Sequence, residues 1–374
     1  MRLDQLLTEI GLQFERASGV DVLDMTLDSR KVADGSLFVA IKGSVGHGMD
    51  YVDSVISSGA SAILYDDWDG EIPKAVPALY VPGLKRKIGR IAHAFYGNPC
   101  SGMNIVGVTG TNGKTTTVHL IAQLADRLGL KAARIGTLGV SVGADKLIES
   151  DRTTPDAITL ASMFAELRSR GVNFVAMEVS SHALDQGRVD GIPFSAGVIT
   201  NLTRDHLDYH GTMEAYGEAK ARLFADFDLQ AAVFNIDDAF CRDLAKRASL
   251  PNVVTYGPGA DQVDIQAIQA TADGSTIRVS INSVVHELQT SLLGSFNASN
   301  IMAAFAAISA IFPEHSDRAL MAIPALQAAP GRMEWFRASE FATVVVDYAH
   351  TPDALENAIK TCRAHCGGEV WSVF

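Results

Sequence analysis

The sequence has little cysteine, a deficit of positive charge and no long apolar run. Only 4 cysteines occur in 374 residues, and because no export signal precedes them we expect reduced thiols in a cytoplasmic protein. The formal net charge of −12 argues against a nucleic-acid-binding protein, which would carry a basic surface. The longest nearly apolar run, Ile301–Pro313, is shorter than the roughly 20 residues that cross a bilayer, so we expect no membrane insertion.

The remaining composition is that of an ordinary globular chain, with 47% hydrophobic and 20% charged residues. At about 100–200 residues per domain, this length predicts two to three domains. Turn-forming residues at Gly97–Pro99 and Pro330–Gly331 place the boundaries. We therefore expect a small α/β N-terminal domain over residues 1–98, a central domain over 99–331 and the first part of a C-terminal domain over 332–374.

The hydrophobic pattern predicts an α/β fold, because short apolar runs alternate with helical patterns. Longer strand–helix repeats in the central region predict a parallel sheet covered on both faces. From 263 to 292 the period changes to two, with a turn at Asn282–Ser283, which predicts an appended antiparallel hairpin. The expected strands are Leu37–Ile41, Ala62–Tyr65, Ala78–Val81, Asn104–Val108, Phe174–Val179 and Gly197–Thr200, and the expected helices are Tyr51–Ser58, Leu84–Tyr96, Thr115–Leu128, Ala157–Ser169, Met213–Phe227 and Asn300–Phe312.

The last 43 residues offer room for one β-α-β unit. Val344–Val346 is typical of a strand, Thr351 and Pro352 of the N-cap and first turn of a helix, and Val370–Phe374 of a second strand. At this length the segment cannot bury a core of its own.

A glycine-rich loop between an expected strand and an expected helix gives the strongest chemical signal. It runs from Gly107 to Thr115 with the sequence GVTGTNGKT, and the backbone N–H groups of such a loop can hold a phosphate. Lys114 would reach the β- and γ-phosphates, and the Thr115 hydroxyl would bind Mg²⁺. Val108 stands where the general P-loop has glycine, so this is a variant form. The alternative is a glycine-rich turn without a ligand, but Gly-Lys-Thr in this context favours ATP or GTP binding.

Two acidic features follow other expected strands. Glu178 ends one strand and is a candidate for completing a metal site beside the loop, although an acidic residue there can also be merely solvated. The segment Thr200–His210 crowds two histidines and two aspartates just past another strand end, where active sites of open α/β sheets lie. The alternative for that segment is a polar loop with capping aspartates.

Lys220 lies on an apolar helix face with Tyr216, Leu223, Phe224 and Phe227. A charged lysine is costly there, so its pKa should fall or it should find a partner. A neutral amine can react with carbon dioxide to give a carbamate, which is an anionic metal ligand. The alternative is a lysine whose stem reaches out to water.

These motifs resemble those of the Mur ligases of peptidoglycan synthesis, and within that family the branch that adds the third residue of the stem peptide, the UDP-N-acetylmuramoyl-tripeptide synthetases. The resemblance covers nearly the whole chain. It rests on Thr26–Arg30, Gly110–Thr116, Met177–His182, Asn201–His210, Gly331–Glu334 and Asp347–Asp353. It implies a UDP-sugar-binding domain, a central ATPase domain and a Rossmann-like C-terminal ligase domain that family members continue past Phe374, so the chain would be truncated.

The resemblance also implies a reaction. A diamino acid would be joined to UDP-N-acetylmuramoyl-L-alanyl-D-glutamate through an acyl phosphate, with ATP going to ADP and phosphate and with Mg²⁺ as the metal. It favours meso-diaminopimelate over L-lysine and implies a cytoplasmic monomer that serves peptidoglycan synthesis, cell-wall biogenesis, cell shape, the cell cycle and cell division. The alternative from another class is a catalytically incompetent fragment that binds nucleotide or UDP-sugar without ligating.

Site residues follow from the resemblance, position by position. The catalytic set would be Lys114, Glu178, His206 and Lys220, the last as N6-carboxylysine. ATP would be bound by Gly110, Thr111, Asn112, Gly113, Lys114, Thr115, Thr116, Asn297, Asn300, Arg332, Asp347 and His350. The metal would be held by Thr115, Glu178, His206 and the Lys220 carbamate. The UDP-substrate would be bound by Leu27, Ser29, Ser44, Val45, Gly46, Thr153, Thr154, Ser180, Gln186 and Arg188.

Overall fold

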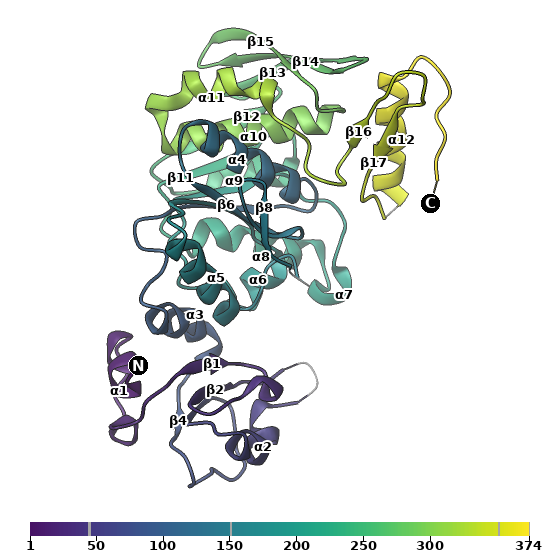
Figure 1. Cartoon of the computed structure of the whole chain (residues 1–374). Coiled ribbons are helices and arrows are strands. Elements are labelled where there is room, and N and C mark those ends of the chain that lie inside the picture. Colours follow the sequence, from purple (N-terminus) through teal and green to yellow (C-terminus); the bar gives the residue numbers. More distant parts are fainter. Residues whose placement is uncertain (44–45, 150–151, 351, 374) are drawn as a thin grey trace. The chain divides into compact units, whose positions relative to one another are not determined.

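The computed structural model describes residues 1–43, 46–149, 152–350 and 352–373, which divide into two compact units (Figure 1). The first unit comprises residues 1–102, 155–171 and 182–192, and the second comprises the other described residues. No helix in the described ranges is both long and apolar enough to cross a bilayer. The domain boundaries expected at 98 and 331 stay predictions.

The first unit is built on a four-stranded, wholly parallel sheet of order β1-β2-β3-β4. Successive side chains of a strand point to opposite faces, and here both faces are covered: Leu37 and Val39 pack in one apolar cluster, Phe38 and Ala40 in another. The elements are α1 (Leu3–Glu9), β1 (Asp24–Thr26), β2 (Ser36–Ala40), α2 (Val52–Ser57), β3 (Ala62–Tyr65), β4 (Ala78–Tyr80), α3 (Leu84–Phe95) and α5 (Ala157–Ser169). The expected strands and helices are confirmed to within a few residues.

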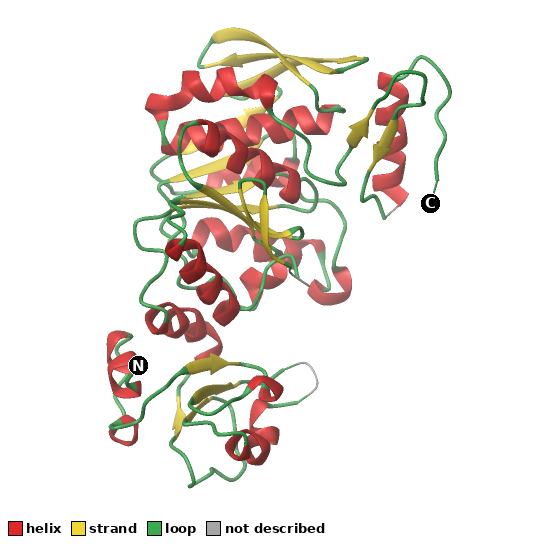
Figure 2. Cartoon of the chain, in the orientation of Figure 1, coloured by secondary structure: helices red, strands yellow, loops and turns green. Residues whose placement is uncertain are grey.

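The second unit contains an eleven-stranded sheet of order β15-β14-β13-β12-β11-β10-β5-β9-β6-β7-β8 (Figure 2). Its strands from β13 to β6 are parallel, as predicted, whereas both ends are antiparallel. The pair β7 and β8 was not expected from the sequence. The strands are β5 (Asn104–Thr109), β6 (Ala132–Gly136), β7 (Gly139–Val142), β8 (Asp145–Ile148), β9 (Phe174–Glu178), β10 (Ala196–Ile199), β11 (Ala231–Asn235), β12 (Val253–Gly257), β13 (Val263–Thr271), β14 (Gly274–Ile281) and β15 (Val284–Thr290).

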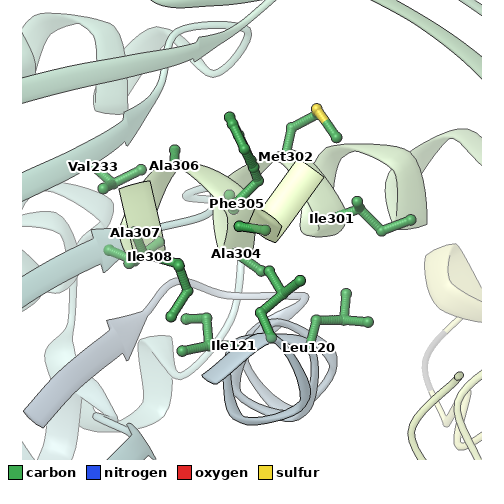
Figure 3. Close-up of a cluster of buried hydrophobic side chains, with 14 of the residues drawn as sticks. Leu120, Ile121, Val233, Ile301, Met302, Ala304, Phe305, Ala306, Ala307 and Ile308 are labelled. Carbon is green, nitrogen blue, oxygen red and sulfur yellow. The ribbon is translucent and has the colours of Figure 1, made fainter. Parts of the chain in front are cut away.

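The helix α10 lies at the centre of the core of this unit. Every side chain from Ile301 to Ile308 is apolar and buried, and the helix packs against Leu120 and Ile121 of α4 and Val233 of β11 (Figure 3). It begins at Ser295, five residues before the expected start, because Gly294 rather than the apolar run sets its N-cap. The helices are α4 (Lys114–Arg127), α6 (Ser181–Asp185, which spans the boundary of the two units), α7 (Leu207–His210), α8 (Met213–Ala225), α9 (Ala239–Arg247), α10 (Ser295–Ile311) and α11 (Ser316–Ala322).

The predicted hairpin is confirmed as β14 and β15 and is extended by β13. Ile277 and Val279 are fully buried while Arg278 between them is exposed, which is the alternation expected of a strand with one covered face. Asn282 and Ser283 form the turn with φ values of 47° and 71°.

The C-terminal segment differs from the predicted β-α-β unit. β17 (Val344–Val346) has the expected bounds but pairs antiparallel with β16 (Glu334–Phe336), since a short connection permits only an antiparallel neighbour. The expected strand at 370–374 was wrong over its described part, 370–373, which carries no strand. The helix α12 (Pro352–His365) begins at the predicted proline. Thr351 and Phe374 lie outside the described residues.

Candidate functional site

The glycine-rich loop joins β5 to α4 at the carboxyl end of the parallel strands. Gly110 and Gly113 have φ values of 141° and 85°, and a Cβ on Gly110 would collide with the Thr200 hydroxyl, so both positions suit glycine alone. Residues just past β10 fasten the loop: the Thr200 hydroxyl donates to the Asn112 carbonyl at 2.6 Å. Asn201 accepts the Thr111 and Asn112 N–H groups at 3.0 and 2.9 Å. The loop is therefore fixed by a second strand end.

The start of α4 is suited to binding an anion. The first N–H groups of a helix have no carbonyl partner within the helix, and the helix dipole favours negative charge there. Among the described residues no side chain caps α4, whose N-cap is Gly113. The Lys114 Nζ turns back to donate to the Gly110 and Thr111 carbonyls, both at 2.9 Å. Burial lowers the pKa of the Lys114 ammonium, against the opposing charges of Glu178 and Asp205.

Glu178 is almost fully buried at the end of β9, with 1% of its surface exposed, so the solvated alternative was wrong. Its Oε1 accepts the Thr137 N–H at 2.8 Å, and its Oε2 lies 3.3 Å from the Thr137 hydroxyl. Burial raises the pKa of this carboxyl, while the Lys114 charge and hydrogen bonds from Thr137 and Thr115 lower it. A carboxylate, a hydroxyl and an ammonium thus meet beside the loop.

Lys220 is also buried, with 1% exposure, so the expectation of an enclosed lysine is confirmed and the solvent-reaching alternative was wrong. Its Nζ donates to the Gly110 carbonyl at 2.8 Å and lies 4.4 Å from the centre of the Tyr216 ring. Burial places the pKa of Lys220 well below its usual value, and the nearby Lys114 charge lowers it further. The neutral amine required for carbamate formation is therefore favoured here.

The histidines past β10 lie around the same tyrosine. His206 is exposed, its Nε2 lies 3.4 Å from the Asp205 carboxylate, and its ring meets the Tyr216 ring edge-on. His210 hydrogen-bonds the Ser181 hydroxyl at 3.0 Å. The Asp205 side chain accepts the His206 N–H. His206 itself occupies the N-cap of α7 without a side-chain cap bond.

Asn297 and Asn300 on α10 are buried and linked to the start of α4. The Thr117 hydroxyl donates to Asn300 Oδ1 at 3.3 Å, and Asn300 Nδ2 donates to Asn297 Oδ1 at 3.2 Å. Asn297 in turn donates to the Leu293 carbonyl at 2.8 Å. The two amides therefore link α10 to the first turn of α4, the helix that follows the glycine-rich loop.

The C-terminal candidates fall into two groups. The Arg332 charge acts on both Lys114 and Glu178, lowering the pKa of each, and its guanidinium stacks 4.5 Å from the Tyr348 ring. Asp347 and His350 are exposed. Asp347 accepts the Met333 N–H at 2.8 Å, and His350 Nδ1 lies 2.9 Å from the Tyr348 carbonyl. Arg332 thus lies near the loop, while the other two order their own segment.

The substrate candidates of the second unit surround Glu178. Thr154 is buried, and its hydroxyl donates to the Glu178 carbonyl at 2.9 Å while accepting the Ser180 N–H at 3.1 Å. The Thr153 hydroxyl lies 3.2 Å from the Thr137 hydroxyl. These three residues are therefore brought together with the carboxylate.

The candidates of the first unit lie on two segments. Leu27 and Ser29 follow β1, where Asp28 caps a short 3₁₀ turn and pairs with Arg30, whose hydrogen bond lowers the pKa of Asp28 to about 2. Gln186 Oε1 accepts both Nε and Nη2 of Arg188 at 2.9 and 2.5 Å. Gly46 is exposed, whereas Ser44 and Val45 lie outside the described residues.

The donor set beside the loop fits Mg²⁺ in part. Within the described ranges, no three His, Cys, Asp or Glu side chains gather closely enough to hold a metal. The Thr115 hydroxyl and the Glu178 carboxylate do meet, and Mg²⁺ typically takes one or two such oxygens and fills its remaining positions with water and phosphate. Lys220 as an ammonium has no lone pair to offer; only a carbamate would add an oxygen ligand.

Two contact residues were missed at the level of sequence. Thr137 follows β6 in the run Gly136–Gly139, and Tyr216 appeared only as part of an apolar face. A small-residue turn at a strand end next to Glu178 was the available signal for Thr137. Nothing in the sequence pointed to the hydroxyl contact of Tyr216, which lies 3.2 Å from Thr111 Oγ1.

Comparison with protein families identifies three matching regions. Residues 108–308 match the Mur ligase middle domain. Residues 331–374 match the Mur ligase glutamate ligase domain, and residues 22–96 match the Mur ligase family catalytic domain.

Individual proteins agree with these matches. A UDP-N-acetylmuramoyl-L-alanyl-D-glutamate–2,6-diaminopimelate ligase of Xanthomonas oryzae pv. oryzae (strain MAFF 311018) is 43% identical over 99% of this chain and 77% of its own length. A solved structure of a ligase of the same name matches 100% of this chain and 76% of its own, with a TM-score of 0.84 and 32% identity. The MurF ligase of Thermotoga maritima, solved in complex with ADP, shares the fold over 91% of this chain and 74% of its own, with a TM-score of 0.61 and 18% identity.

Proposed function

The chain belongs to the Mur ligase family, and from that premise we propose that it is the ATP-dependent ligase that adds meso-diaminopimelate to UDP-N-acetylmuramoyl-L-alanyl-D-glutamate in peptidoglycan precursor synthesis. The names and identities of its relatives support this substrate pair. The single observation that carries the chemistry is the meeting of Lys114, Glu178 and Lys220 around the loop Gly110–Gly113.

The loop would bind the phosphates of ATP. The N–H groups at the start of α4 supply donors, and Lys114 supplies a cation whose hydrogen bonds to described residues go to backbone carbonyls. Anionic phosphate would draw the ammonium away from them, because its full negative charge attracts an ammonium more strongly than a neutral carbonyl does. Thr111, Asn112 and Thr116 complete the loop, and Arg332 adds positive charge nearby. Further nucleotide contacts would come from the side chains of Asn297, Asn300, Asp347 and His350.

Mg²⁺ would be held by Thr115 and Glu178, with His206 and a carbamate on Lys220 as further ligands, and when bound it would neutralise charge on the triphosphate. The carbamate proposal rests on the burial of Lys220 and its lowered pKa. Carbamate formation joins the neutral amine nitrogen to the carbon of carbon dioxide and releases one proton.

The UDP-substrate would be bound by two groups of residues. Leu27, Ser29 and the loop ending at Gly46 would hold the nucleotide-sugar. The side chains of Thr153, Thr154, Ser180, Gln186 and Arg188 would hold the dipeptide.

The reaction then proceeds in two steps. The D-glutamyl side-chain carboxylate attacks the γ-phosphorus of ATP, the bond to the β-phosphate oxygen breaks, and ADP leaves. The amine of the diamino acid, having lost a proton, attacks the acyl carbon and expels phosphate. Lys114 and the loop N–H groups counter the negative charge that opposes the first step. Water must be excluded, because it would hydrolyse the acyl phosphate.

Phosphate release tests the proposal. The chain is incubated with MgCl₂ and ATP, and released phosphate is measured with UDP-N-acetylmuramoyl-L-alanyl-D-glutamate alone, with meso-diaminopimelate alone, with both, and with L-lysine in place of diaminopimelate. We expect rapid release only with the UDP-dipeptide and diaminopimelate together, and a tripeptide product by mass spectrometry.

Two results would contradict the proposal. Tight binding of ATP and UDP-dipeptide with no product would favour the alternative of a catalytically incompetent binding fragment. Equal turnover with L-lysine would remove the assigned amino-acid specificity.

A further inference from the structure

Thr137 contacts both a candidate metal ligand and a candidate residue of the UDP-dipeptide site. Its backbone N–H and its hydroxyl both face the Glu178 carboxylate, at 2.8 and 3.3 Å, and the same hydroxyl lies 3.2 Å from the Thr153 hydroxyl. Glu178 is a candidate metal ligand, while Thr153 is a candidate for binding the UDP-dipeptide. One side chain therefore touches both sites.

The close approach is built into the backbone. A Cβ on Gly136 would collide with the Glu178 carboxyl group, so only glycine lets the end of β6 pass close enough for the next residue to donate its N–H. The register Ile135↔Met177 between β6 and β9 brings the two strand ends level. Thr137 is consequently held in place by main-chain geometry and not only by its own side chain.

The number of hydroxyl hydrogens decides which groups donate and which accept in this contact. A threonine hydroxyl carries one hydrogen, so Thr137 cannot donate to Glu178 and to Thr153 at the same time. The Thr137 hydrogen can go to Thr153 or to Glu178 Oε2, and because the charged carboxylate is the stronger acceptor, we take the chain in which Thr153 donates to Thr137 and Thr137 donates to Glu178. In that arrangement Glu178 Oε2 accepts the Thr137 hydroxyl and Oε1 accepts the Thr137 N–H, in addition to the hydrogen bond from Thr115.

We propose that Thr137 is a positioning residue that couples the dipeptide site to the cation site; this inference rests on the function proposed above. When the Thr153 hydrogen goes to an acceptor of the UDP-dipeptide, Thr153 can take the Thr137 hydrogen instead. Glu178 Oε2 then loses the Thr137 hydroxyl as a donor, so its negative charge is less compensated and attracts a cation more strongly. Binding of the UDP-dipeptide should therefore strengthen Mg²⁺ binding, and by reciprocity Mg²⁺ should strengthen binding of the UDP-dipeptide.

Calorimetry without turnover measures this coupling. A nonhydrolysable ATP analogue is bound to the full chain, MgCl₂ is titrated, and the half-saturating concentration is compared with and without UDP-N-acetylmuramoyl-L-alanyl-D-glutamate. For the unmodified chain we expect the UDP-dipeptide to lower that concentration about five-fold, as the exchange of one ordinary hydrogen bond implies. Thr137→Val should bind each ligand but show a shift below two-fold, and Thr137→Ser should keep the full shift.

Controls separate this inference from loss of structure and from the proposed function. Thr276→Val on β14 changes a half-buried threonine elsewhere in the same sheet and should leave the coupling intact. Thr137→Ala deletes the same hydroxyl without adding a methyl group and replaces Thr137→Val if that variant unfolds. Equal shifts in the unmodified chain and the hydroxyl-deleted variant overturn the inference and leave the ligase function standing. Failure of the unmodified chain to bind the UDP-dipeptide overturns both.

Discussion

Side-chain burial differs between the glycine-rich loop region of the central sheet and the C-terminal segment over 332–373. Around the loop, Glu178 and Lys220 are each 1% exposed and are held by hydrogen bonds to other elements. In the C-terminal segment, by contrast, the apolar Phe341 and Trp371 are 77% and 85% exposed. Burial therefore follows the packing of neighbouring elements and not the polarity of the residue.

This difference has an energetic meaning. Charged groups enclosed in a core are tolerated only when they are paired and hydrogen-bonded, so the loop region depends on each of its polar partners. Exposed apolar side chains have given up little water contact, so single changes there should cost little. Substitutions in the two regions can test the contrast.

The largest effect is expected at Lys114. Lys114→Ala removes the cation that would meet the phosphates, and we expect the rate of phosphate release to fall by at least about a thousand-fold. The exposed Lys146, which pairs with Glu149, provides the matched control, and Lys146→Ala should retain the full rate. Normal ligation by Lys114→Ala would refute the assigned role.

Substitutions in the core of the central sheet and in the C-terminal segment should also differ strongly in their effect on the free energy of unfolding. Phe305 on α10 is 2% exposed, and Phe305→Ala should lower the free energy of unfolding by about 3–5 kcal/mol through lost burial and a cavity. Trp371→Ala should change it by less than about 0.5 kcal/mol, since surface substitutions rarely exceed that. Urea denaturation followed by circular dichroism measures both, and comparable losses would erase the contrast.

The next prediction concerns the role of the buried Lys220 in catalysis. Lys220→Ala should lower the ligation rate by about a hundred-fold or more through loss of a group acting on transition-state charge. A short carboxylic acid such as acetate should restore part of the rate by replacing the carbamate. Unimpaired activity of the variant, with no response to acetate, would exclude the carbamate.

The smallest effect concerns acid stability. Burial and the Arg134 charge lower the pKa of His119 to about 4, below the ordinary value near 6.5 of an unfolded chain. The unfolded state then binds the proton first, so this stability is present above pH 6.5 and is lost as the pH falls towards 4. At pH 5 the loss amounts to about 2 kcal/mol relative to pH 7.

His119→Gln should remove this part of the pH dependence, because an amide does not titrate in that range. The measurement is the free energy of unfolding of both proteins at pH 7 and pH 5. A change that touches no titratable group gives the matched comparison: Thr276→Val on β14 should leave the difference unchanged. Identical pH dependence of the His119 variant and the unmodified chain would contradict the expectation.

Local patterns were sufficient to predict most of the elements. α5 and β17 have the expected bounds because each is framed by clear signals, Asp156 as the N-cap in one case and a run of three valines in the other. The parallel centre of the sheet followed from alternating strands and helices. The antiparallel extension β7–β8 did not, because strands of four residues each are too short to show a clear periodicity.

Long-range contacts could not be predicted from periodicity alone. The helical spacing placed Lys220 on an apolar face but left open whether its amine reaches water, and its hydrogen-bond partner Gly110 lies 110 residues away. Thr137 carries no motif of its own, and only the strand order β5-β9-β6 brings it to Glu178. The prediction of a strand at 370–374 was wrong over its described part, because an apolar sequence indicates that a strand is possible but not that a neighbouring strand exists to pair with it.

The two-residue turn between β14 and β15 has a practical consequence. Asn282 and Ser283 join the outermost pair of strands at one end of the eleven-stranded sheet, several strands removed from the loop between β5 and α4. A fluorescent label or a short inserted peptide at this hairpin tip would leave the nucleotide-facing strand ends untouched. The tip thus offers an attachment point for following ligand-induced motion by spectroscopy or for immobilising the enzyme on a sensor surface.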